Sequence, residues 1–572
     1  MSLSRPDPRR SLQHCALLAL ALLGCGLAAC GDTAAKQPQV DDHAQDESVV
    51  QALQAVVRNG RGLPGTRPGA EELGRLQRLY QTSGYTPLWV SPSGDLRQSG
   101  KEALDRLRKA DSEGLRPNDY FADALDSLSR RVSDQKLRDA AAVAGLDAGL
   151  SLAVLEYLRH IHLGRVTPRA VGYSIEALPE QHDFVALLEA VLQDGSLDEI
   201  VRELEPPLEQ YRLARAALGE YRKRQGDSLL AQPLRIAVPL KPGDTTASLS
   251  ALAHRLMATG DLTDETGAPV RYEGALVEAV RRFQARHGLA PDSVLGKATL
   301  EELNIPVSWR VHQLELSLER LRWLRDLPDE PFLLVNIPMF ELTAWSSPMA
   351  SGPPAFRTGV IVGRALDTET PVFVEEMQYL IFQPFWNIPP SITRTETIPA
   401  IERDSDYLRK NNMEIVRGQG DDADPVVLSG STLEKLARGE LRVRQRPGPQ
   451  NALGPIKFVF PNNQNIYLHG TPAEQLFDRT RRDFSHGCVR VEDPTSLAEW
   501  VLSGQPEWTR DRIVEAMTAP GRISRRVNLL RPLTVVLYYT TASVEADGTV
   551  RFARDIYKHD PELDRALHRV GD

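Results

Sequence analysis

One cysteine lies among residues that could make it reactive. Cys488 follows a Ser-His-Gly triplet at 485–487, and His469 precedes it by 488 − 469 = 19 residues. A thiol is a poor nucleophile while protonated, so acyl transfer needs a neighbouring base to generate the thiolate. His469 is the candidate base, because a strand, a loop and a returning strand would bring it to the sulfur. The spacing therefore predicts a cysteine–histidine site for acyl transfer.

The residues beside Cys488 suggest supporting roles in the same chemistry. Gly487 permits a tight turn, and the backbone N–H groups of Gly487 and Cys488 would then face the oxyanion of a tetrahedral intermediate. Arg490 offers a fixed cation for a substrate carboxylate. The alternative for Arg490, an ordinary solvated surface charge, stays open.

Two other interpretations of the cluster also stay open. Cys488 could be an inert buried side chain, or His469, His486 and Cys488 could hold Zn²⁺, since imidazole and thiolate suit that ion. The H-E-x-x-H pattern of zinc peptidases does not occur in the sequence. His160 and His162 are two apart on a predicted helix and point to different sides, so we expect no metal shared between them.

The composition is that of a folded, exported protein of several domains. The chain has 572 residues, which predicts about four domains. Apolar residues at 41% and charged residues at 25% are ordinary globular values. The formal charge of −9 and the lack of a long basic block argue against nucleic acid as a partner.

The N-terminus predicts export. Three arginines within the first ten residues precede an apolar run at 15–29, which is the order of a signal peptide. Leu27-Ala-Ala-Cys30-Gly resembles a bacterial lipobox, which implies a signal peptide over 1–30 and a lipid on Cys30. Cys25 is a weaker candidate, and a cleaved signal without lipid stays open. No later stretch supplies the roughly 20 apolar residues of a membrane span, so we expect an exported protein that is soluble or lipid-anchored.

Cysteine usage agrees with this interpretation. The four cysteines lie at 15, 25, 30 and 488. Removal of the signal and acylation of Cys30 would leave Cys488 as the one free thiol, so no intrachain disulfide can form. In an oxidising compartment such a thiol is either a small buried hydrophobe or a reactive group.

The hydrophobic pattern divides the rest of the chain. Residues 31–68 are polar and rich in Gly and Pro, which predicts a flexible linker. Leucines at spacings of three and four predict an all-helical domain over 69–230, and a smaller helical unit follows at 243–304. Residues 328–560 are β-rich, with an insertion at 391–450 that we interpret as a helical lid.

The smaller helical unit resembles a known module. Residues 279–289, followed by Pro291-Asp292, Gly296, Thr299 and Leu303, resemble the peptidoglycan-binding repeat, which is a three-helix domain. The sequence departs from that family at Ser293, where Gly is usual, so the turn is expected to differ. Glycan affinity and the alternative of a helical spacer stay open.

The residues around Cys488 resemble a known active site. His469-Gly470, followed by Phe-Ser-His-Gly-Cys-Val-Arg-Val at 484–491, resembles the signature of the L,D-transpeptidase (YkuD) catalytic domain. The domain order resembles that of the large Gram-negative L,D-transpeptidases of the YcbB type, over about 70–560. The lid would follow Pro384-Phe-Trp386-Asn-Ile-Pro389, and we expect Trp386 in the cleft wall or the core.

The resemblance implies a fold and a role for each site residue. The fold would be an all-α scaffold domain, a small three-helix binding domain and a mainly-β catalytic domain with an inserted helical lid. Cys488 would be the nucleophile, His469 the proton donor and acceptor, and the Gly470 carbonyl the group that orients His469. Ser485 and His486 would shape the loop.

The resemblance also implies a reaction and its partners. The donor would be a peptidoglycan tetrapeptide stem and the acceptor a second stem, joined by a 3→3 link between two meso-diaminopimelate residues. No metal or organic cofactor would be needed, and carbapenems would acylate the thiol. The protein would work in the periplasm, attached to a membrane by its lipid. An L,D-carboxypeptidase, a transpeptidase that attaches lipoproteins, and a non-catalytic wall-binding scaffold remain as alternatives.

Overall fold

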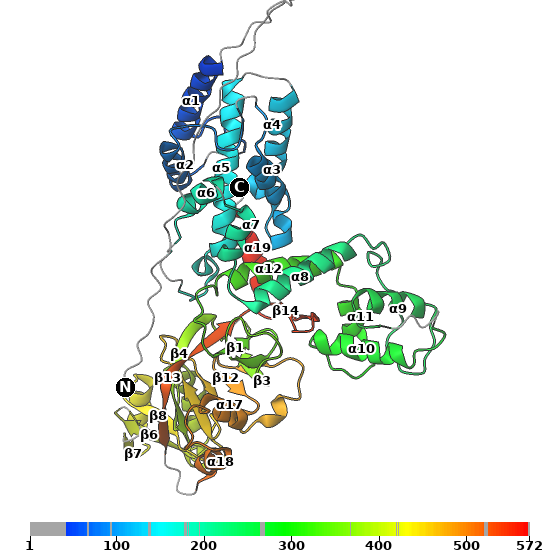
Figure 1. Ribbon diagram of the computed structural model, residues 1–572. Helices are drawn as coiled ribbons and strands as arrows, with labels where there is room; N and C mark the ends of the chain where they lie inside the picture. Colours follow the sequence, from blue (N-terminus) through cyan, green and yellow to red (C-terminus); the bar gives the residue numbers. More distant parts are fainter. Residues whose placement is uncertain are drawn as a thin grey trace, which may run out of the picture.

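The computed structural model describes residues 42–569, apart from 66–67, 92–93, 135–138, 177–179, 181, 194, 264–268, 366–367, 419, 421–422 and 520–523. The predicted signal peptide, Cys30 and the first part of the predicted linker lie outside the described residues. Three parts of the molecule can be followed in Figure 1: a helical bundle, a β-rich body below it and a small helical domain to the side.

The helical bundle surrounds one buried helix, α5 (Ala140–Leu163). By length and composition α5 could cross a membrane, contrary to the expectation from sequence, but 83% of its most apolar window is buried inside the protein. It is the core helix of the bundle. The helices around it are α1 (Asp42–Asn59), α2 (Ala70–Thr82), α3 (Gln98–Arg108), α4 (Ala122–Asp134), α6 (Phe184–Gln193) and α7 (Leu197–Leu204).

Helix α1 corrects the prediction of a flexible linker over 31–68. Residues 42–59 are helical, and Leu53, Val56 and Val57 are buried in the core of the bundle. Polar residues dominate the start of this helix, so its short apolar stripe was hidden within a hydrophilic segment. Packing against α5 supplies the stability that composition alone does not indicate.

Two helices join the bundle to the rest of the chain. α8 (Glu209–Arg224) and α12 (Val307–Arg322) pack against each other between the bundle and the β-rich body (Figure 1). The C-terminal helix α19 (His559–Arg569) also packs on α12. These three helices form the junction of the molecule.

The junction is held by buried charges on α12. Glu319 accepts hydrogen bonds from the backbone N–H groups of Arg165 and Val166 in the bundle, at 2.6 and 2.9 Å. Arg320 donates to Asp560 of α19 at 2.6 Å, and both side chains are fully buried. One helix thus binds the bundle and the C-terminal helix at successive positions.

The small helical domain contains α9 (Leu249–Ala258), α10 (Ala275–Arg286) and α11 (Lys297–Leu303) around a core of its own. Ser293 takes the left-handed conformation, φ +61°, in which Gly is usual. Its N–H donates to Gln284 and its carbonyl accepts from Tyr272, so side-chain contacts hold the turn in place. Arg286 donates to the Val550 carbonyl and fixes this domain against the β-rich body.

A nine-stranded sheet forms the β-rich body. Its order is β11-β3-β12-β10-β9-β4-β13-β1-β2, and an added β2–β3 pairing brings its two ends together. The strands are β1 (Phe332–Asn336), β2 (Glu341–Trp345), β3 (Phe356–Gly363), β4 (Phe373–Phe382), β9 (Ile456–Val459), β10 (Leu468–His469), β11 (Asp483–Ser485), β12 (Val489–Val491) and β13 (Arg525–Tyr538). Helices α17 (Pro494–Val501) and α18 (Arg510–Thr518) and a hairpin of β14 (Ala542–Val544) and β15 (Val550–Phe552) complete it.

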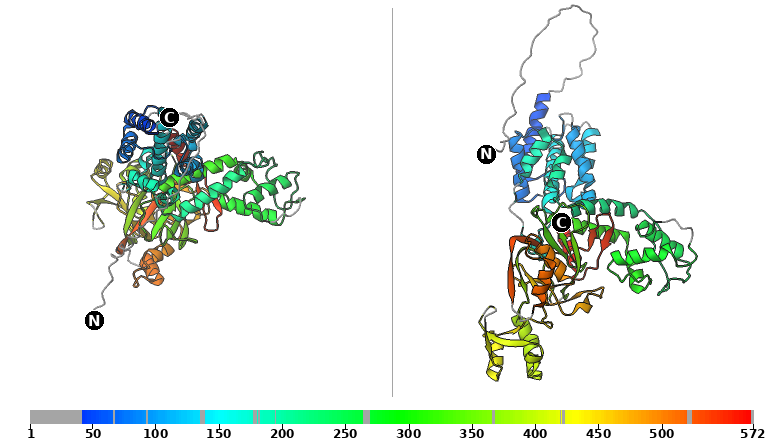
Figure 2. Two further views of the ribbon diagram at one scale, coloured as in Figure 1. Left: turned by 45° about the horizontal axis from the view of Figure 1, so that its top comes forward. Right: turned by 60° about the horizontal axis from the view of Figure 1, so that its bottom comes forward.

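The insertion after β4 is a small α+β unit that projects from the body, as the right-hand view of Figure 2 shows. Its first half is helical as predicted: α13 (Pro390–Ile392), a π-helical turn at Thr393–Thr397, α14 (Ile398–Arg403) and α15 (Tyr407–Lys410). The insertion also contains a sheet, which the sequence prediction missed, of order β5-β8-β6-β7, together with α16 (Gly430–Ala437). Those strands are β5 (Trp386–Asn387), β6 (Met413–Arg417), β7 (Asp424–Val426) and β8 (Arg442–Gln445).

The insertion therefore starts at β5, before the predicted boundary at 391. It has its own core around Ile415, Leu436 and Val443. Its strands are short and carry several charges, so they resemble loops in sequence. We refer to residues 386–445 as the lid.

The ion pair at the junction gives a test of the fold. Replacing Asp560 by Ala leaves the buried Arg320 guanidinium without its partner, so we expect the free energy of unfolding to fall by about 3–5 kcal/mol. Urea unfolding followed by circular dichroism measures this change. Glu220→Ala, which removes an exposed pair with Lys223, is the control and should leave the midpoint unchanged. A loss below about 1 kcal/mol for Asp560→Ala would show that the junction does not depend on this pair.

Candidate active site

Strand pairing places His469 on the face of the sheet opposite Leu468, where its side chain is buried. In the register of β10, Leu468 pairs with Phe458 of β9 and Val489 of β12, and all three side chains are fully buried. His469 is the next residue, so its side chain lies on the opposite face. Its partners in the register are Lys457 and Arg490, which share that face.

Cys488 lies on the same face, just before β12. Its thiol receives a hydrogen bond from the Tyr467 hydroxyl and lies 3.7 Å from the Asn465 carbonyl oxygen. The Tyr467 ring is 5.7 Å from the His469 ring, centroid to centroid. The thiol and the imidazole thus border the same tyrosine, although no hydrogen bond joins them directly in the described structure.

His469 is oriented by the next residue of the chain. Its Nδ1 lies 2.5 Å from the Gly470 carbonyl oxygen, which can only accept a hydrogen bond. Nδ1 therefore carries the hydrogen, and Nε2 keeps the lone pair that a general base needs. Burial, aided by the nearby Arg490 charge, lowers the pKa of His469 to about 3. The imidazole is neutral at neutral pH.

The thiol is also neutral at rest. Burial raises the pKa of the Cys488 thiol above its ordinary value, and the Tyr467 hydrogen bonds and the charges of Lys457 and Arg490 only partly oppose this shift. The unliganded site therefore holds a thiol beside a neutral imidazole rather than a thiolate–imidazolium pair. If this thiol acts as a nucleophile, its proton has to be transferred as it attacks.

The turn before Cys488 is held by its own side chains. Gly487 has φ +111°, a conformation that favours glycine. Ser485 Oγ donates to the Cys488 carbonyl at 2.5 Å and accepts the Gly487 N–H at 3.1 Å. Thr370 donates to the Gly487 carbonyl at 2.7 Å.

These hydrogen bonds correct the expected role of the Gly487 N–H. The N–H of Gly487 is already donated to Ser485, so it does not face an oxyanion as predicted from sequence. The N–H of Cys488 has no partner among the described residues. It is the backbone donor that remains for a tetrahedral intermediate.

His486 points away from the thiol, toward the lid. Its Nε2 lies 3.0 Å from a carboxylate oxygen of Glu396, which belongs to the π-helical turn of the lid. Among the described residues, His469, His486 and Cys488 do not come close enough to share a metal ion. The alternative of a zinc site at these three residues is therefore wrong.

Two contributors were missed by the sequence prediction. Tyr467 could have been found, because it lies two residues before His469 and a strand places such residues on one face. Lys457 carried no signal, since only the pairing of β9 with β10 brings its ammonium group to 3.6 Å from the Tyr467 ring centre. Trp386, which was expected in the cleft wall or the core, lies at the base of the lid, where its indole donates a hydrogen bond to Tyr467.

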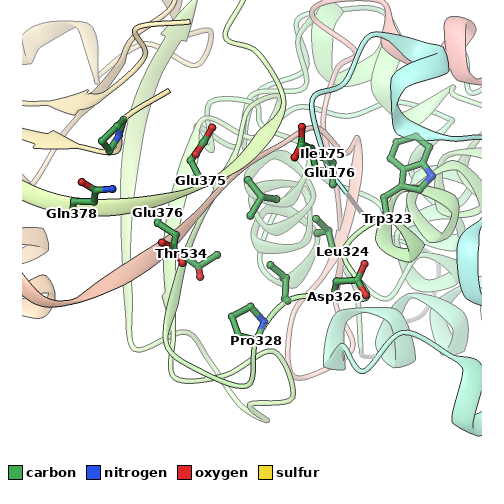
Figure 3. A pocket seen from close by; sticks show the side chains of 13 residues that line it. Ile175, Glu176, Trp323, Leu324, Asp326, Pro328, Glu375, Glu376, Gln378 and Thr534 are labelled. Atoms are coloured by element: carbon green, nitrogen blue, oxygen red, sulfur yellow. The ribbon is translucent and has the colours of Figure 1, made fainter. Parts of the chain in front are cut away.

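A separate cavity of about 380 Å³ lies where the bundle meets the sheet (Figure 3). Glu176, Asp326, Glu375 and Glu376 line it, and burial with the neighbouring carboxylates raises the pKa of Glu375. The cavity contains neither Cys488 nor His469. It is distinct from the candidate active site.

The neutral resting state predicts the pH dependence of thiol labelling. Because burial raises the pKa of Cys488, its rate of alkylation by iodoacetamide should climb through the alkaline range and reach no plateau below about pH 8.5, the ordinary thiol value. Mass spectrometry of the labelled protein at each pH measures this rate. Lys457→Met removes a nearby cation and should move the curve to higher pH. A plateau below pH 7 would instead indicate a preformed thiolate–imidazolium pair.

Three family models match successive parts of the chain. The model described as "Scaffold domain" matches residues 74–218, "Putative peptidoglycan binding domain" matches 247–303, and "L,D-transpeptidase catalytic domain" (YkuD) matches 330–513. These ranges cover α2 to α8, α9 to α11, and the sheet from β1 to β12 with the lid.

Two known proteins were also found to be similar. A protein named "Putative L,D-transpeptidase" from Haemophilus influenzae is 31% identical over 283 residues, which cover 49% of this chain and 55% of that protein. The chain thus matches about half the length of this relative. A crystal structure of the L,D-transpeptidase from Xylanimonas cellulosilytica is 14% identical, with a TM-score of 0.15, over 53% of this chain and 99% of that one.

The candidate site lies within the matched catalytic domain, since His469 and Cys488 both fall within residues 330–513. The chain carries a scaffold domain, a peptidoglycan-binding domain and a catalytic domain of the YkuD L,D-transpeptidase family.

Proposed function

We propose that this protein is a peptidoglycan L,D-transpeptidase that forms 3→3 links between meso-diaminopimelate residues through a thioester on Cys488. The observation that supports the proposal is that Cys488, directly before β12, and His469 of β10 both border Tyr467. The catalytic and peptidoglycan-binding domains support peptidoglycan as the substrate.

The first half-reaction acylates the enzyme. His469 Nε2 takes the thiol proton as the sulfur attacks the carbonyl at the L-centre of diaminopimelate in the donor stem. The tetrahedral oxyanion meets the Cys488 N–H. The C–N bond to the terminal D-Ala breaks, and His469 returns its proton to the leaving amine.

The second half-reaction transfers the acyl group. The side-chain amine of diaminopimelate on an acceptor stem attacks the thioester and loses a proton to His469. The C–S bond breaks, and the sulfur takes that proton back. Atoms balance over the two steps, because one amide is exchanged for another and D-Ala is released. The chemistry described requires only groups of this chain and the two stems.

The charges around the sulfur favour the thiolate of the reacting state over the neutral thiol of the resting state. Lys457 and Arg490 both lie near the thiol and favour negative charge on it, while burial opposes that charge before substrate arrives. Arg490 would also hold a carboxylate of the stem peptide. This arrangement keeps the nucleophile protonated until a carbonyl is in place.

The lid would reduce competition from water. It contacts the site at two points, the Trp386–Tyr467 hydrogen bond and the His486–Glu396 pair. A closed lid would exclude solvent from the thioester and leave the acceptor amine as the nucleophile. Attack of water on the thioester would make the protein an L,D-carboxypeptidase. Attack by a lysine amine of a lipoprotein would attach that lipoprotein to the stem peptide. Acylation by carbapenems, a lipid on Cys30 and a periplasmic location belong to the same proposal.

Incubation with purified sacculi tests the proposed reaction. We expect wild-type protein to produce tetrapeptide–tripeptide dimers joined by 3→3 links, detected by mass spectrometry of muropeptides. Cys488→Ala should abolish them, and His469→Gln should slow their formation by about 10²–10⁴-fold, the usual contribution of a general acid–base group. Release of tripeptides alone would indicate hydrolysis. No change in the muropeptides would favour the non-catalytic scaffold.

The lid contact gives a second test. The His486–Glu396 pair is partly exposed and contributes at most about 1 kcal/mol, so Glu396→Gln should lower the cross-linking rate by less than tenfold. The same variant should raise the ratio of hydrolysis to cross-linking, because a looser lid admits water. Glu402→Gln, an exposed change elsewhere on the lid, is the control. An unchanged ratio in Glu396→Gln would show that this contact does not govern water access.

A further inference from the structure

One segment of the chain connects the catalytic sheet to the helical bundle and returns. After a short helical turn at Pro168–Val171, Ser174 forms a β-bridge with Phe373 of β4, and its N–H donates to the Val372 carbonyl at 2.9 Å. The chain re-enters the bundle at Phe184, where α6 begins. Glu180 and His182 lie on this returning part.

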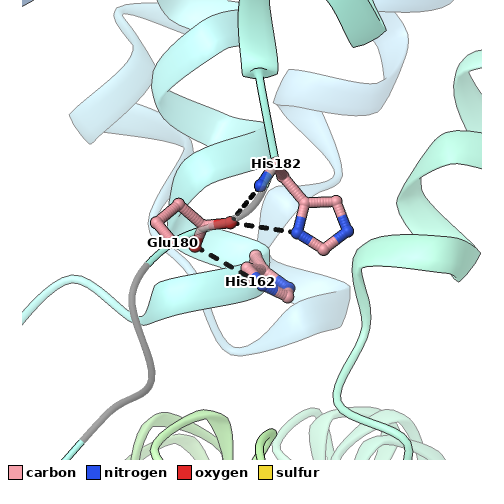
Figure 4. Close-up of side chains that lie close together, drawn as sticks. All are labelled: His162, Glu180 and His182. Carbon is pink, nitrogen blue, oxygen red and sulfur yellow. Dashed lines mark hydrogen bonds and ion pairs between the residues drawn. The ribbon is translucent and has the colours of Figure 1, made fainter.

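Glu180 and His182 meet His162 at the end of α5, as Figure 4 shows. His162 Nε2 lies 3.6 Å from one carboxylate oxygen of Glu180, and His182 Nδ1 lies 3.0 Å from the other. The two imidazole rings are 4.5 Å apart, centroid to centroid. One ligand atom from each of the three residues lies within 4.8 Å of the other two.

The hydrogen bonding of His162 leaves its Nε2 atom without a hydrogen to donate to Glu180. Its Nδ1 lies 3.0 Å from the Leu204 carbonyl oxygen, and because a carbonyl can only accept, Nδ1 carries the hydrogen. In the neutral ring Nε2 then presents a lone pair to the Glu180 carboxylate, which is also an acceptor. A cation between these two acceptors, 3.6 Å apart, would satisfy both.

The His162 side chain is only 13% exposed, so the space in front of its Nε2 is largely enclosed by protein. Glu180 brings a carboxylate and His182 a second imidazole within 4.8 Å of it. A metal ion with a preference for imidazole and carboxylate fits these donor atoms.

We propose that His162, Glu180 and His182 bind a divalent transition metal ion of the Zn²⁺ class. Two imidazole nitrogens and one carboxylate oxygen are a known ligand set for zinc, with a water molecule in the fourth position. Tetrahedral ligands at about 2.0–2.1 Å stand about 3.3–3.4 Å from one another, close to the 3.6 Å between His162 and Glu180. His182 coordinates through Nδ1 once its hydrogen resides on Nε2.

The contact with Leu204 completes the site. A ligating histidine usually donates its other N–H to a carboxylate or a backbone carbonyl, which fixes the ring and its tautomer. His162 makes that bond to the last residue of α7. The ion would therefore join α5, α7 and the returning segment.

A metal ion at this site would lie near the junction between the helical bundle and the catalytic sheet. Ile175 and Glu176, earlier in the chain, line the cavity between the bundle and the sheet, and Ser174 forms the bridge with β4. A metal ion at 162, 180 and 182 would hold Glu180 and His182 to the bundle, a few residues along the chain from that bridge. The site lies apart from Cys488 and His469.

Metal binding to the purified, untagged chain without its signal peptide tests the proposal. After treatment with a chelator and dialysis, addition of Co²⁺ should give the visible absorption bands of a tetrahedral complex at one ion per chain. Zn²⁺ should displace Co²⁺ and raise the melting temperature. Glu180→Gln and His182→Ala should each weaken binding by about tenfold or more and remove the rise in melting temperature.

His254→Ala is the matched control, because His254 is a partly exposed histidine paired with one carboxylate, Asp227, in a different domain. It should bind Co²⁺ as the wild type does. Both ligand variants alter partly exposed side chains, and the melting temperature of each metal-free protein shows whether it folds. A dissociation constant above about 1 mM for the wild type, or equal binding by the ligand variants, would overturn the proposal.

Discussion

The register between β10 and β12 is the constraint on which the active site depends. Because side chains alternate along a strand, the buried Leu468 and Val489 place His469 and Arg490 together on the opposite face. A slip by one residue would turn His469 to the face of Leu468, away from Cys488. The same apolar residues that close the sheet therefore determine where the two candidate residues lie.

A second set of contacts keeps the domains in a fixed arrangement around that sheet. Successive residues of α12 bind different partners, since Glu319 caps backbone N–H groups of the bundle and Arg320 pairs with Asp560 of α19. Buried ions are costly unless they are paired, so each partner is required once the other is buried. Arg286 makes a comparable bond from the peptidoglycan-binding domain to the body. The junction thus depends on specific polar pairs as well as on apolar contact.

The electrostatics of the candidate site leave both the thiol and the imidazole neutral in the unliganded structure. Burial alone would keep Cys488 protonated and His469 neutral, and the nearby cations Lys457 and Arg490 favour negative charge on the sulfur. In the proposed reaction, the low pKa of His469 would make it a good donor to the leaving amine once it has taken a proton. The lid contacts Tyr467 and His486 and would connect the proposed chemistry to access by water.

The sequence by itself determined the order of the three domains, because domain type is encoded in local motifs and in the hydrophobic period. The same motifs singled out Cys488 and His469 as the candidate pair. The sequence also identified Gly470 as the neighbour of His469, although only the coordinates show the 2.5 Å contact. Local patterns did not reveal α1 within a polar segment, the strands of the lid, or the engagement of the Gly487 N–H by Ser485. The same holds for Lys457 beside Tyr467 and for His162 beside Glu180 and His182. These features bring together residues that are distant in the chain, or they depend on the hydrogen bonds within one turn. Only the packing of strands and helices in the folded protein could therefore determine them.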